Sequence, residues 1–246
     1  MRFAAIADIH GNHLALEAVL EDIRRQGITE IVNLGDCFSG PLTAGKTADI
    51  LLGLDALTVR GNHDRYLIDQ APEAMHVSDR VAYSELTERH LDWLRGLPFN
   101  AVYRDEAYLC HATPADDNVY WLESVSSDGH VHLSPLEEIE ALAAGVDFPL
   151  ILCGHTHIPR AVRLSDGRLI VNPGSVGCPA YDDDLPRYHK VEAGHPFASY
   201  AILEKDGERW LPVFRQVAYD HQAMAELAAE KGRHEWASGL ATGWLR

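Results

Sequence analysis

The sequence predicts an α/β (α+β) fold in which two stacked mixed sheets are flanked by helices. Three observations support this prediction. Short apolar runs, typical of buried strands, alternate with amphipathic stretches through residue 64. Five of the apolar runs end at clusters of metal-ligand side chains. In the later half, pairs of strand-like runs flank turn signals, which is typical of hairpins and indicates a second sheet.

The first part of the chain reads as strand–helix–strand–helix–strand. After a strand over Phe3–Ala7, Asn12 is placed to cap a helix. The apolar residues of this helix follow an i, i+3, i+4, i+7 pattern from Leu16, and Gly27 is placed to end it. The next elements are a strand over Glu30–Leu34, a helix near Thr43–Leu52 and a strand over Leu54–Val59.

The remainder predicts a helical stretch, further strands and terminal helices. Residues 65–97 look helical, Ala115–Ser134 and Pro179–Pro196 look like irregular loops, and Ser134-Pro135 begins a helix. Asp220–Gly243 predicts one or two terminal helices. The expected strands are Phe99–Tyr103, Glu106–Cys110, Phe148–Cys153, the hairpin Arg160–Leu164 with Arg168–Val171, and the hairpin Phe197–Glu204 with Arg209–Gln216. We expect one domain over residues 1–246, with 112–134 as a candidate substrate loop and 219–246 as terminal helices.

Composition excludes several classes of protein. The 21 basic and 37 acidic residues leave a net charge of −16, which argues against binding to a nucleic-acid backbone. No apolar run is long enough to span a membrane, and the apolar start of the chain stops at Asp8, too soon for a signal peptide. We therefore expect a cytoplasmic protein that binds neither nucleic acid nor membrane.

Five polar clusters carry the chemistry, and each ends a short apolar run. Asp8, Asp36 and Asn62 stand 28 and 26 residues apart, about the length of one βαβ unit. Because parallel strands end at one edge of a sheet, where ligands bind, we expect these three residues to meet there. The clusters are Asp8-Ile9-His10, Gly35-Asp36, Gly61-Asn62-His63-Asp64, Cys110-His111 and Gly154-His155-Thr156-His157.

The clusters offer seven oxygen and nitrogen ligands, which suits two transition metals better than a structural zinc. In extended backbone, Asp8 and His10 would point to one side and reach one ion, and His155 and His157 would repeat that geometry. Two metals would attract a phosphate despite the acidic chain and lower the pKa of a bridging water. The resulting hydroxide would attack phosphorus, with His63 as proton donor to the leaving oxygen. The expected metals are two divalent or trivalent ions among Mn, Fe, Zn, Co and Ni.

In order and spacing, the five motifs resemble the calcineurin-like metallophosphoesterase family from about residue 3 to 177. The resemblance implies a four-layer α/β/β/α sandwich and a phosphoric ester hydrolase with a binuclear site. It implies that Asp8, His10, Asp36 and His157 hold one metal. It implies that Asp36, Asn62, His111 and His155 hold the other. His63 would donate a proton and contact the phosphate.

One departure places the chain nearer the small bacterial branch of this family. Protein serine/threonine phosphatases have Asp-Arg three residues beyond the bridging Asp, and this chain has Ser39-Gly40 there. The resemblance implies a phosphomonoesterase or phosphodiesterase acting on small or nucleotide substrates. The alternatives are a dinucleoside polyphosphate hydrolase, a protein phosphatase and a non-catalytic scaffold like the phosphoesterase-like subunit of retromer.

Several roles stay open at the level of sequence. Asn12 either touches the phosphate or caps its helix, and Asp64 either orients His63 or places a charge at a helix N-terminus. Tyr120 and Trp121 either stack on an aromatic leaving group or pack in the protein. The four cysteines are either buried small residues or thiolates at the metals: Cys37, Cys110, Cys153 and Cys178. An apolar group near the end of the chain either packs terminal helices or forms a homodimer contact: Met224, Leu227, Leu240 and Trp244.

Overall fold

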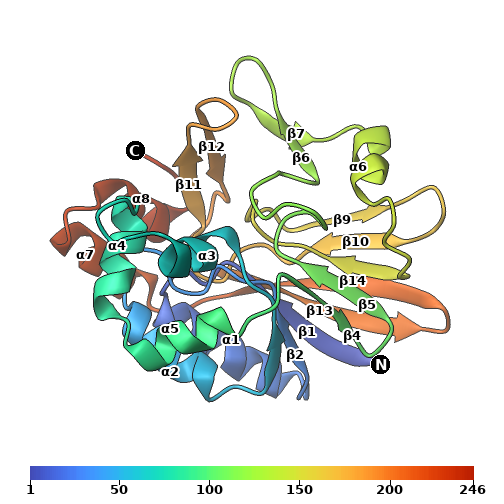
Figure 1. Cartoon of the computed structure of the whole chain (residues 1–246), viewed down its shortest axis with the longest axis horizontal. Coiled ribbons are helices and arrows are strands. Elements are labelled where there is room, and N and C mark those ends of the chain that lie inside the picture. The colour runs from blue at the N-terminus through green and yellow to red at the C-terminus, as the bar shows by residue number, and fades with distance from the viewer.

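The computed structural model describes residues 1–246 and contains two five-stranded mixed sheets that lie face to face (Figure 1). The first sheet has the order β14 (Arg209–Val217), β13 (Ala198–Asp206), β1 (Arg2–Ile6), β2 (Ile31–Asn33) and β3 (Ala56–Thr58). The second has the order β4 (Asn100–Tyr103), β5 (Ala107–Cys110), β8 (Leu150–Leu152), β10 (Leu169–Asn172) and β9 (Arg160–Arg163). The prediction of two stacked mixed sheets is confirmed.

The alternation of side chains along β1 explains how its sheet is covered on both faces. Phe3 and Ala5 are fully buried among residues of the second sheet, whereas Ala4 and Ile6 are buried among residues of the helices. Successive side chains of a strand point to opposite faces, so a continuous apolar run places β1 between two apolar layers.

The strands β1, β2 and β3 are parallel, as their spacing predicts, and therefore end at one edge of the sheet. Helix α1 (His13–Arg25) joins the first two strands, and α2 (Ala44–Leu52) joins the next two. The side chain of Asn12 caps α1 by accepting a hydrogen bond from the Ala15 N–H. This topology brings the residues after each strand together.

The stretch predicted as helical contains three helices: α3 (Asn62–Asp69), α4 (Val77–Glu85) and α5 (Glu88–Arg95). The first break contains Pro72, which disfavours helical backbone at the residue before it. The second break lies at Thr87, the N-cap of α5. Further along the chain, α6 (Leu136–Leu142) begins after Pro135, and α7 (His221–Glu230) and α8 (His234–Thr242) form the terminal pair.

The last hairpin is correctly predicted as a hairpin, but it extends the first sheet instead of the second. Strand β13 lies antiparallel to β1, with Arg2 opposite Glu204 and Ala5 opposite Ala201. The paired residues lie about 200 positions apart in the sequence, so no local sequence pattern predicts that these two strands pair.

Two segments predicted as irregular loops contain two-stranded ribbons. The ribbon of β6 (Glu123–Val125) and β7 (Val131–Leu133) lies within Ala115–Ser134. The ribbon of β11 (Ala180–Asp183) and β12 (His189–Glu192) lies within Pro179–Pro196. Both ribbons project from the same side of the sandwich in Figure 1. Their strands are too short and too polar to show the two-residue period of a buried sheet.

The molecule has four layers, as the family resemblance implies. One core fills the space between the two sheets, and a second lies between the first sheet and helices α1, α2, α4 and α5. The outer face of the second sheet is covered by α6 and by Trp121, which is 2% exposed. None of the helices is both long and apolar enough to cross a lipid bilayer.

The terminal helices pack on the rest of the protein. Met224 and Leu240 are buried in one cluster with Leu42, and Leu227 packs against it. The prediction that this apolar group packs terminal helices is confirmed for these residues, whereas Trp244 is 47% exposed.

The turn after β10 holds the backbone that follows β1. The Gly177 N–H and the Ser175 hydroxyl both donate hydrogen bonds to the Asp8 carbonyl, at 3.0 Å and 2.7 Å. A Cβ at Gly177 would lie 1.8 Å from the Ile9 carbonyl oxygen, so only glycine permits this approach.

We therefore expect Gly177→Ala to lower the free energy of unfolding by about 3 kcal/mol or more, because backbone must move to admit the methyl group. Chemical denaturation measures this loss. Gly53→Ala is the matched control, because the nearest atoms lie 3.5 Å from its Cβ position, and it should change stability by about 1 kcal/mol at most. Equal stabilities of the two variants would contradict the proposed close contact.

Candidate metal centre

The structure brings all seven predicted ligand residues to one edge of the sandwich. The clusters directly follow β1, β2, β3, β5 and β8, so both sheets contribute to the site. The side chains are buried except that of His155, which is partly exposed. The seven residues are Asp8, His10, Asp36, Asn62, His111, His155 and His157.

The backbone at most of these residues is left-handed, not extended. Seven non-glycine residues in the chain have a positive φ. The five of them that are predicted ligands are Asp8 at 55°, His10 at 51°, Asp36 at 53°, His155 at 71° and His157 at 60°. Such backbone costs energy in residues that carry a Cβ and concentrates at functional sites. The extended i, i+2 geometry expected for Asp8 and His10 is therefore wrong, although the two side chains do converge.

Six of the seven residues form two groups whose ligand atoms lie within 4.8 Å of one another. One group contains Asp8, His10 and His157, and the other contains Asp36, His111 and His155. His155 and His157 thus fall into different groups, as the family resemblance implies and contrary to the interpretation that their i, i+2 spacing lets them share one ion. Asn62 joins the second group, because its Oδ1 lies 3.0 Å from His111 Nε2.

Each of the four imidazoles uses one ring nitrogen to contact a backbone carbonyl. His10 Nδ1 lies 2.8 Å from the Ser39 oxygen, and His157 Nδ1 lies 2.9 Å from the Cys178 oxygen. A carbonyl only accepts, so these nitrogens carry the hydrogen and the opposite nitrogens keep a lone pair in the neutral ring. Metal-binding histidines typically show this arrangement. The other two contacts are His111 Nδ1 to Leu34 O at 2.7 Å and His155 Nε2 to Asn118 O at 2.9 Å.

The arrangement of the remaining lone pairs fits bound cations. His10 Nε2 and His157 Nε2 lie only 3.1 Å apart. His111 Nε2 faces two acceptors, Asn62 Oδ1 at 3.0 Å and Asp36 Oδ2 at 3.2 Å. Lone pairs at these distances repel unless a positive charge lies among them. The donor set therefore suits a metal ion in each group.

The pKa shifts of two of the four imidazoles, and of the Asp36 carboxyl, agree with this geometry. Burial, together with the charge of His157, lowers the pKa of His10 to about 4, and burial, together with His111, lowers that of His155 to about 4. Burial opposes ionisation of Asp36, but His111 and His63 hold the pKa of its carboxyl well below the usual range. Burial lowers the pKa of His111 and His157, but Asp36 raises that of His111 to about 9, and Asp8 raises that of His157 well above its usual range. Neutral imidazoles and ionised carboxylates are the forms that bind metals, so these two rings would release a proton when a metal binds.

The partner of His63 is Asp79, a residue that the sequence analysis missed. His63 Nδ1 lies 2.8 Å from Asp79 Oδ1, and Asp79 is 1% exposed on α4. Burial lowers the pKa of His63, but Asp36 and then Asp79 outweigh it and raise the pKa to about 9. Asp79 stands beside no ligand cluster in the sequence, so its only signal is a carboxylate on the buried face of a helix.

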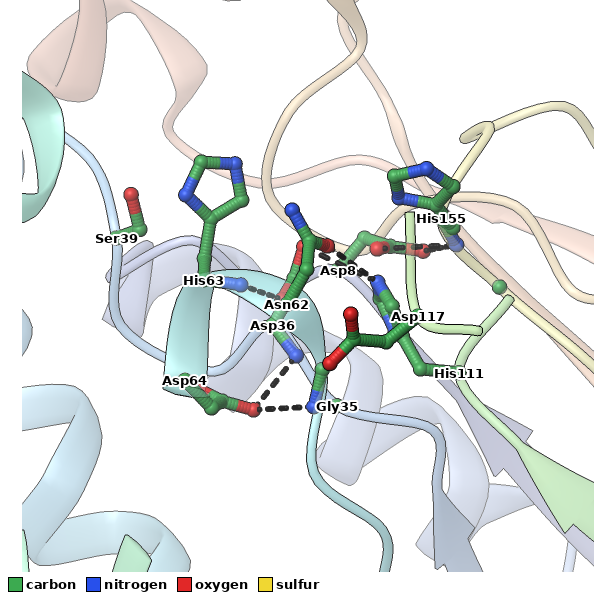
Figure 2. Close-up of polar contacts among 12 residues, drawn as sticks. Asp8, Gly35, Asp36, Ser39, Asn62, His63, Asp64, His111, Asp117 and His155 are labelled. Carbon is green, nitrogen blue, oxygen red and sulfur yellow. Dashed lines mark hydrogen bonds and ion pairs between the residues drawn. The ribbon is translucent and has the colours of Figure 1, made fainter. Parts of the chain in front are cut away.

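Asp64 does not contact His63, and the prediction that it orients His63 is wrong. Its carboxylate accepts hydrogen bonds from the N–H groups of Asp36, Cys37 and Gly61 at 2.9, 2.9 and 3.0 Å. Figure 2 shows its side chain and the His63 ring pointing in opposite directions from the start of α3. The alternative is correct: Asp64 places its charge at a helix N-terminus, where it also joins two loops.

Asn12 is a helix cap and not a phosphate contact. It is fully buried, and its Nδ2 donates to the Gly177 carbonyl and the Tyr219 hydroxyl, each at 3.1 Å. With Oδ1 accepting from Ala15, no polar atom of Asn12 is free to bind a substrate.

A cleft of about 1410 Å³ opens above the two groups. The predicted loop 112–134 contributes Tyr120 to its wall, and the β11–β12 ribbon contributes Tyr181. Trp121 instead packs under α6, so the packing alternative holds for Trp121. Tyr120 lines the cleft, and its ring packs edge-on against His155 and His189. All four cysteines are buried and neither group contains one, in agreement with the structural alternative.

Comparison with known proteins gives the family. Residues 1–194 match the model of the calcineurin-like phosphoesterase superfamily domain. An uncharacterized protein of Methanocaldococcus jannaschii is 27% identical over 249 aligned residues, covering 95% of this chain and 94% of that protein. The crystal structure of a metallophosphoesterase from Sphaerobacter thermophilus has a TM-score of 0.76, at 26% identity over 99% of each chain.

The matched region contains every residue of the two ligand groups and the histidine paired with Asp79. This family and these groups indicate a metal-dependent phosphoester hydrolase. The chain belongs to the calcineurin-like phosphoesterase superfamily.

Proposed function

We propose that the protein is a binuclear phosphoesterase that hydrolyses small phosphate esters, with His63 as the proton donor. The observation that supports this most directly is the pairing of two ligand groups with a separate imidazole, since His63 contacts Asp79 and belongs to neither group. In this proposal, Asp36 would be the carboxylate shared by both metals, because its Oδ2 lies 3.2 Å from His111 Nε2 in one group and its charge also acts on His10 in the other.

In hydrolysis, the two ligand groups would bind the metals, and His63 would donate the proton. When bound, the metals would supply positive charge for the phosphate oxygens and lower the pKa of a water. His63 would hold a proton on Nε2, because Asp79 accepts from Nδ1 and stabilises the charged ring. It would pass that proton to the leaving oxygen.

The cleft favours a small organic phosphate as the substrate. Its volume admits a nucleotide-sized molecule, and Tyr66, Tyr120 and Trp236 supply aromatic faces along its walls. Phosphomonoesters and phosphodiesters are the leading candidates, and a dinucleoside polyphosphate is an alternative. A protein phosphatase is less favoured, since Ser39 stands where that branch has an aspartate.

A substrate panel tests the proposal against the scaffold alternative. The purified protein would be loaded in turn with Mn, Fe, Co, Ni and Zn. It would then be assayed with p-nitrophenyl phosphate, bis-p-nitrophenyl phosphate, AMP and diadenosine tetraphosphate. We expect metal-dependent release of alcohol or phosphate from at least one ester. Absence of turnover with every metal and substrate would favour a non-catalytic scaffold.

The roles of Asp36 and His63 predict that replacing Asp36 lowers the metal content and that replacing His63 does not. Asp36→Asn should lose most of both metals, because a neutral amide replaces the bridging carboxylate. His63→Ala should keep nearly the wild-type metal content and lose about 100-fold or more in kcat, because only the proton donor is removed. Elemental analysis after gel filtration, combined with steady-state kinetics, measures both. Loss of a metal in His63→Ala would contradict its assignment.

The role of Asp79 predicts a dependence on the leaving group. Asp79→Asn should lower kcat about 10-fold or more for phenyl phosphate and much less for p-nitrophenyl phosphate, because a better leaving group needs less protonation. Asp55→Asn, an exposed position without a side-chain hydrogen bond, is the control. An equal loss for both esters would show that Asp79 acts on the fold and not through His63.

A further inference from the structure

The wall of the cleft beside His63 contains the site's only arginine. Among the 33 residues that line the cleft, Arg233 is the sole lysine or arginine, whereas seven are acidic. Arg233 precedes α8 and lies outside the region that matches the family model, which ends at residue 194. The terminal helices thus add a cation to a cleft whose other charged residues, apart from histidines, are acidic.

Hydrogen bonds place Arg233 next to the proposed proton donor. Its Nη1 donates to the Ser78 hydroxyl at 3.0 Å, and Ser78 directly precedes Asp79, the partner of His63. Trp236, in the first turn of α8, packs edge-on against the His10 ring, with 6.0 Å between the ring centroids. Since His63 faces the leaving oxygen in the proposed function, Arg233 lies on the leaving-group side of the site.

The guanidinium is held in place and keeps free donors. Its Nε donates to Glu235 at 2.5 Å, which together with Ser78 fixes its position, and Nη2 has no protein partner. The side chain is 14% exposed, so an anion bound there would be largely shielded from water. Asp182 and Asp183 end strand β11, Asp184 begins the turn of the β11–β12 ribbon, and all three line the cleft.

A second donor in the same wall lacks a partner. Ser39 is 1% exposed, lines the cleft, and has a hydroxyl with no hydrogen-bond partner. Its backbone carbonyl holds His10, and Figure 2 shows its side chain on the side of the His63 ring. A buried hydroxyl without a partner costs free energy, and a bound ligand would recover it.

We propose that Arg233 and Ser39 bind an oxyanion carried by the leaving group, so that the enzyme prefers esters whose alcohol bears a second phosphate or a carboxylate. This inference rests on the proposed function, because it assigns the leaving-group side from His63. Arg233 is the only lysine or arginine that lines the cleft, which suits one additional anionic group. The acidic ribbon disfavours longer polyanions.

Paired substrates test the proposal and distinguish the two kinds of anion. Adenosine 3′,5′-bisphosphate would be compared with 5′-AMP and 3′-AMP, and 4-carboxyphenyl phosphate with phenyl phosphate, by kcat/KM with the Mn-loaded enzyme. We expect the wild type to prefer the substrate with the additional anion in at least one pair. Arg233→Gln should reduce that preference about tenfold, as expected for loss of a charged hydrogen bond, and Ser39→Ala about threefold.

Two further variants separate electrostatics from packing. Glu235→Gln should increase the preference, because it removes a negative charge beside the bound anion. Arg80→Gln, an exposed arginine on α4 without a side-chain hydrogen bond, should leave it unchanged. Melting temperatures would establish that each variant is folded.

The failure of this inference is distinct from failure of the proposed function. Hydrolysis of the simple esters without a preference for the second anion would overturn only the role of Arg233 and Ser39. An equal loss for all substrates in Arg233→Gln, together with no effect of Ser39→Ala, would do the same. Absence of hydrolysis of every substrate would overturn both.

Discussion

The hydrogen bonds to the Asp64 carboxylate hold the loops after β2 and β3 against each other. The positions of the ligand residues in these loops depend on this contact. Three backbone N–H groups, from the loops after β2 and β3, converge on this one buried side chain. The loops touch so closely that a Cβ at Gly61 would lie 2.1 Å from Asp36 Oδ1. Asp36 and Asn62 are thereby brought within reach of the imidazoles that the second sheet supplies, such as His111.

This convergence of ligand residues requires energetically unfavourable backbone conformations. Left-handed residues with a Cβ are each unfavourable by about 1–2 kcal/mol, and five of them cluster here. Surrounding hydrogen bonds hold them: the His10 N–H donates to the Asp36 carbonyl at 3.0 Å, and the His155 N–H donates to Asp8 Oδ2 at 3.1 Å. The rigid sheets below supply the packing that makes such local strain tolerable, because the side chains of β1 from Phe3 to Ile6 are fully buried on both faces.

Sequence reasoning predicted the parts of the site that follow from topology and local pattern. The spacing of Asp8, Asp36 and Asn62 predicted parallel strands and their common edge, which the structure confirms. It could not reveal Asp79, because the contact with His63 depends on how α4 packs and not on spacing. The sequence also could not predict that β13 pairs with β1, since an apolar hairpin could pair with the edge of many strands. The left-handed backbone at the ligand residues could not be predicted, because these positions hold Asp or His and not glycine.

The place of β13 has a consequence for how the protein folds. β1 is sandwiched between β2, which follows it closely in sequence, and a strand that begins at Ala198. Pairings of such long sequence separation close large loops and slow folding. The core between the sheets therefore completes only after nearly the whole chain is available. During synthesis on the ribosome, the edge of β1 that pairs with β13 therefore lacks this partner until residues 198–206 have emerged.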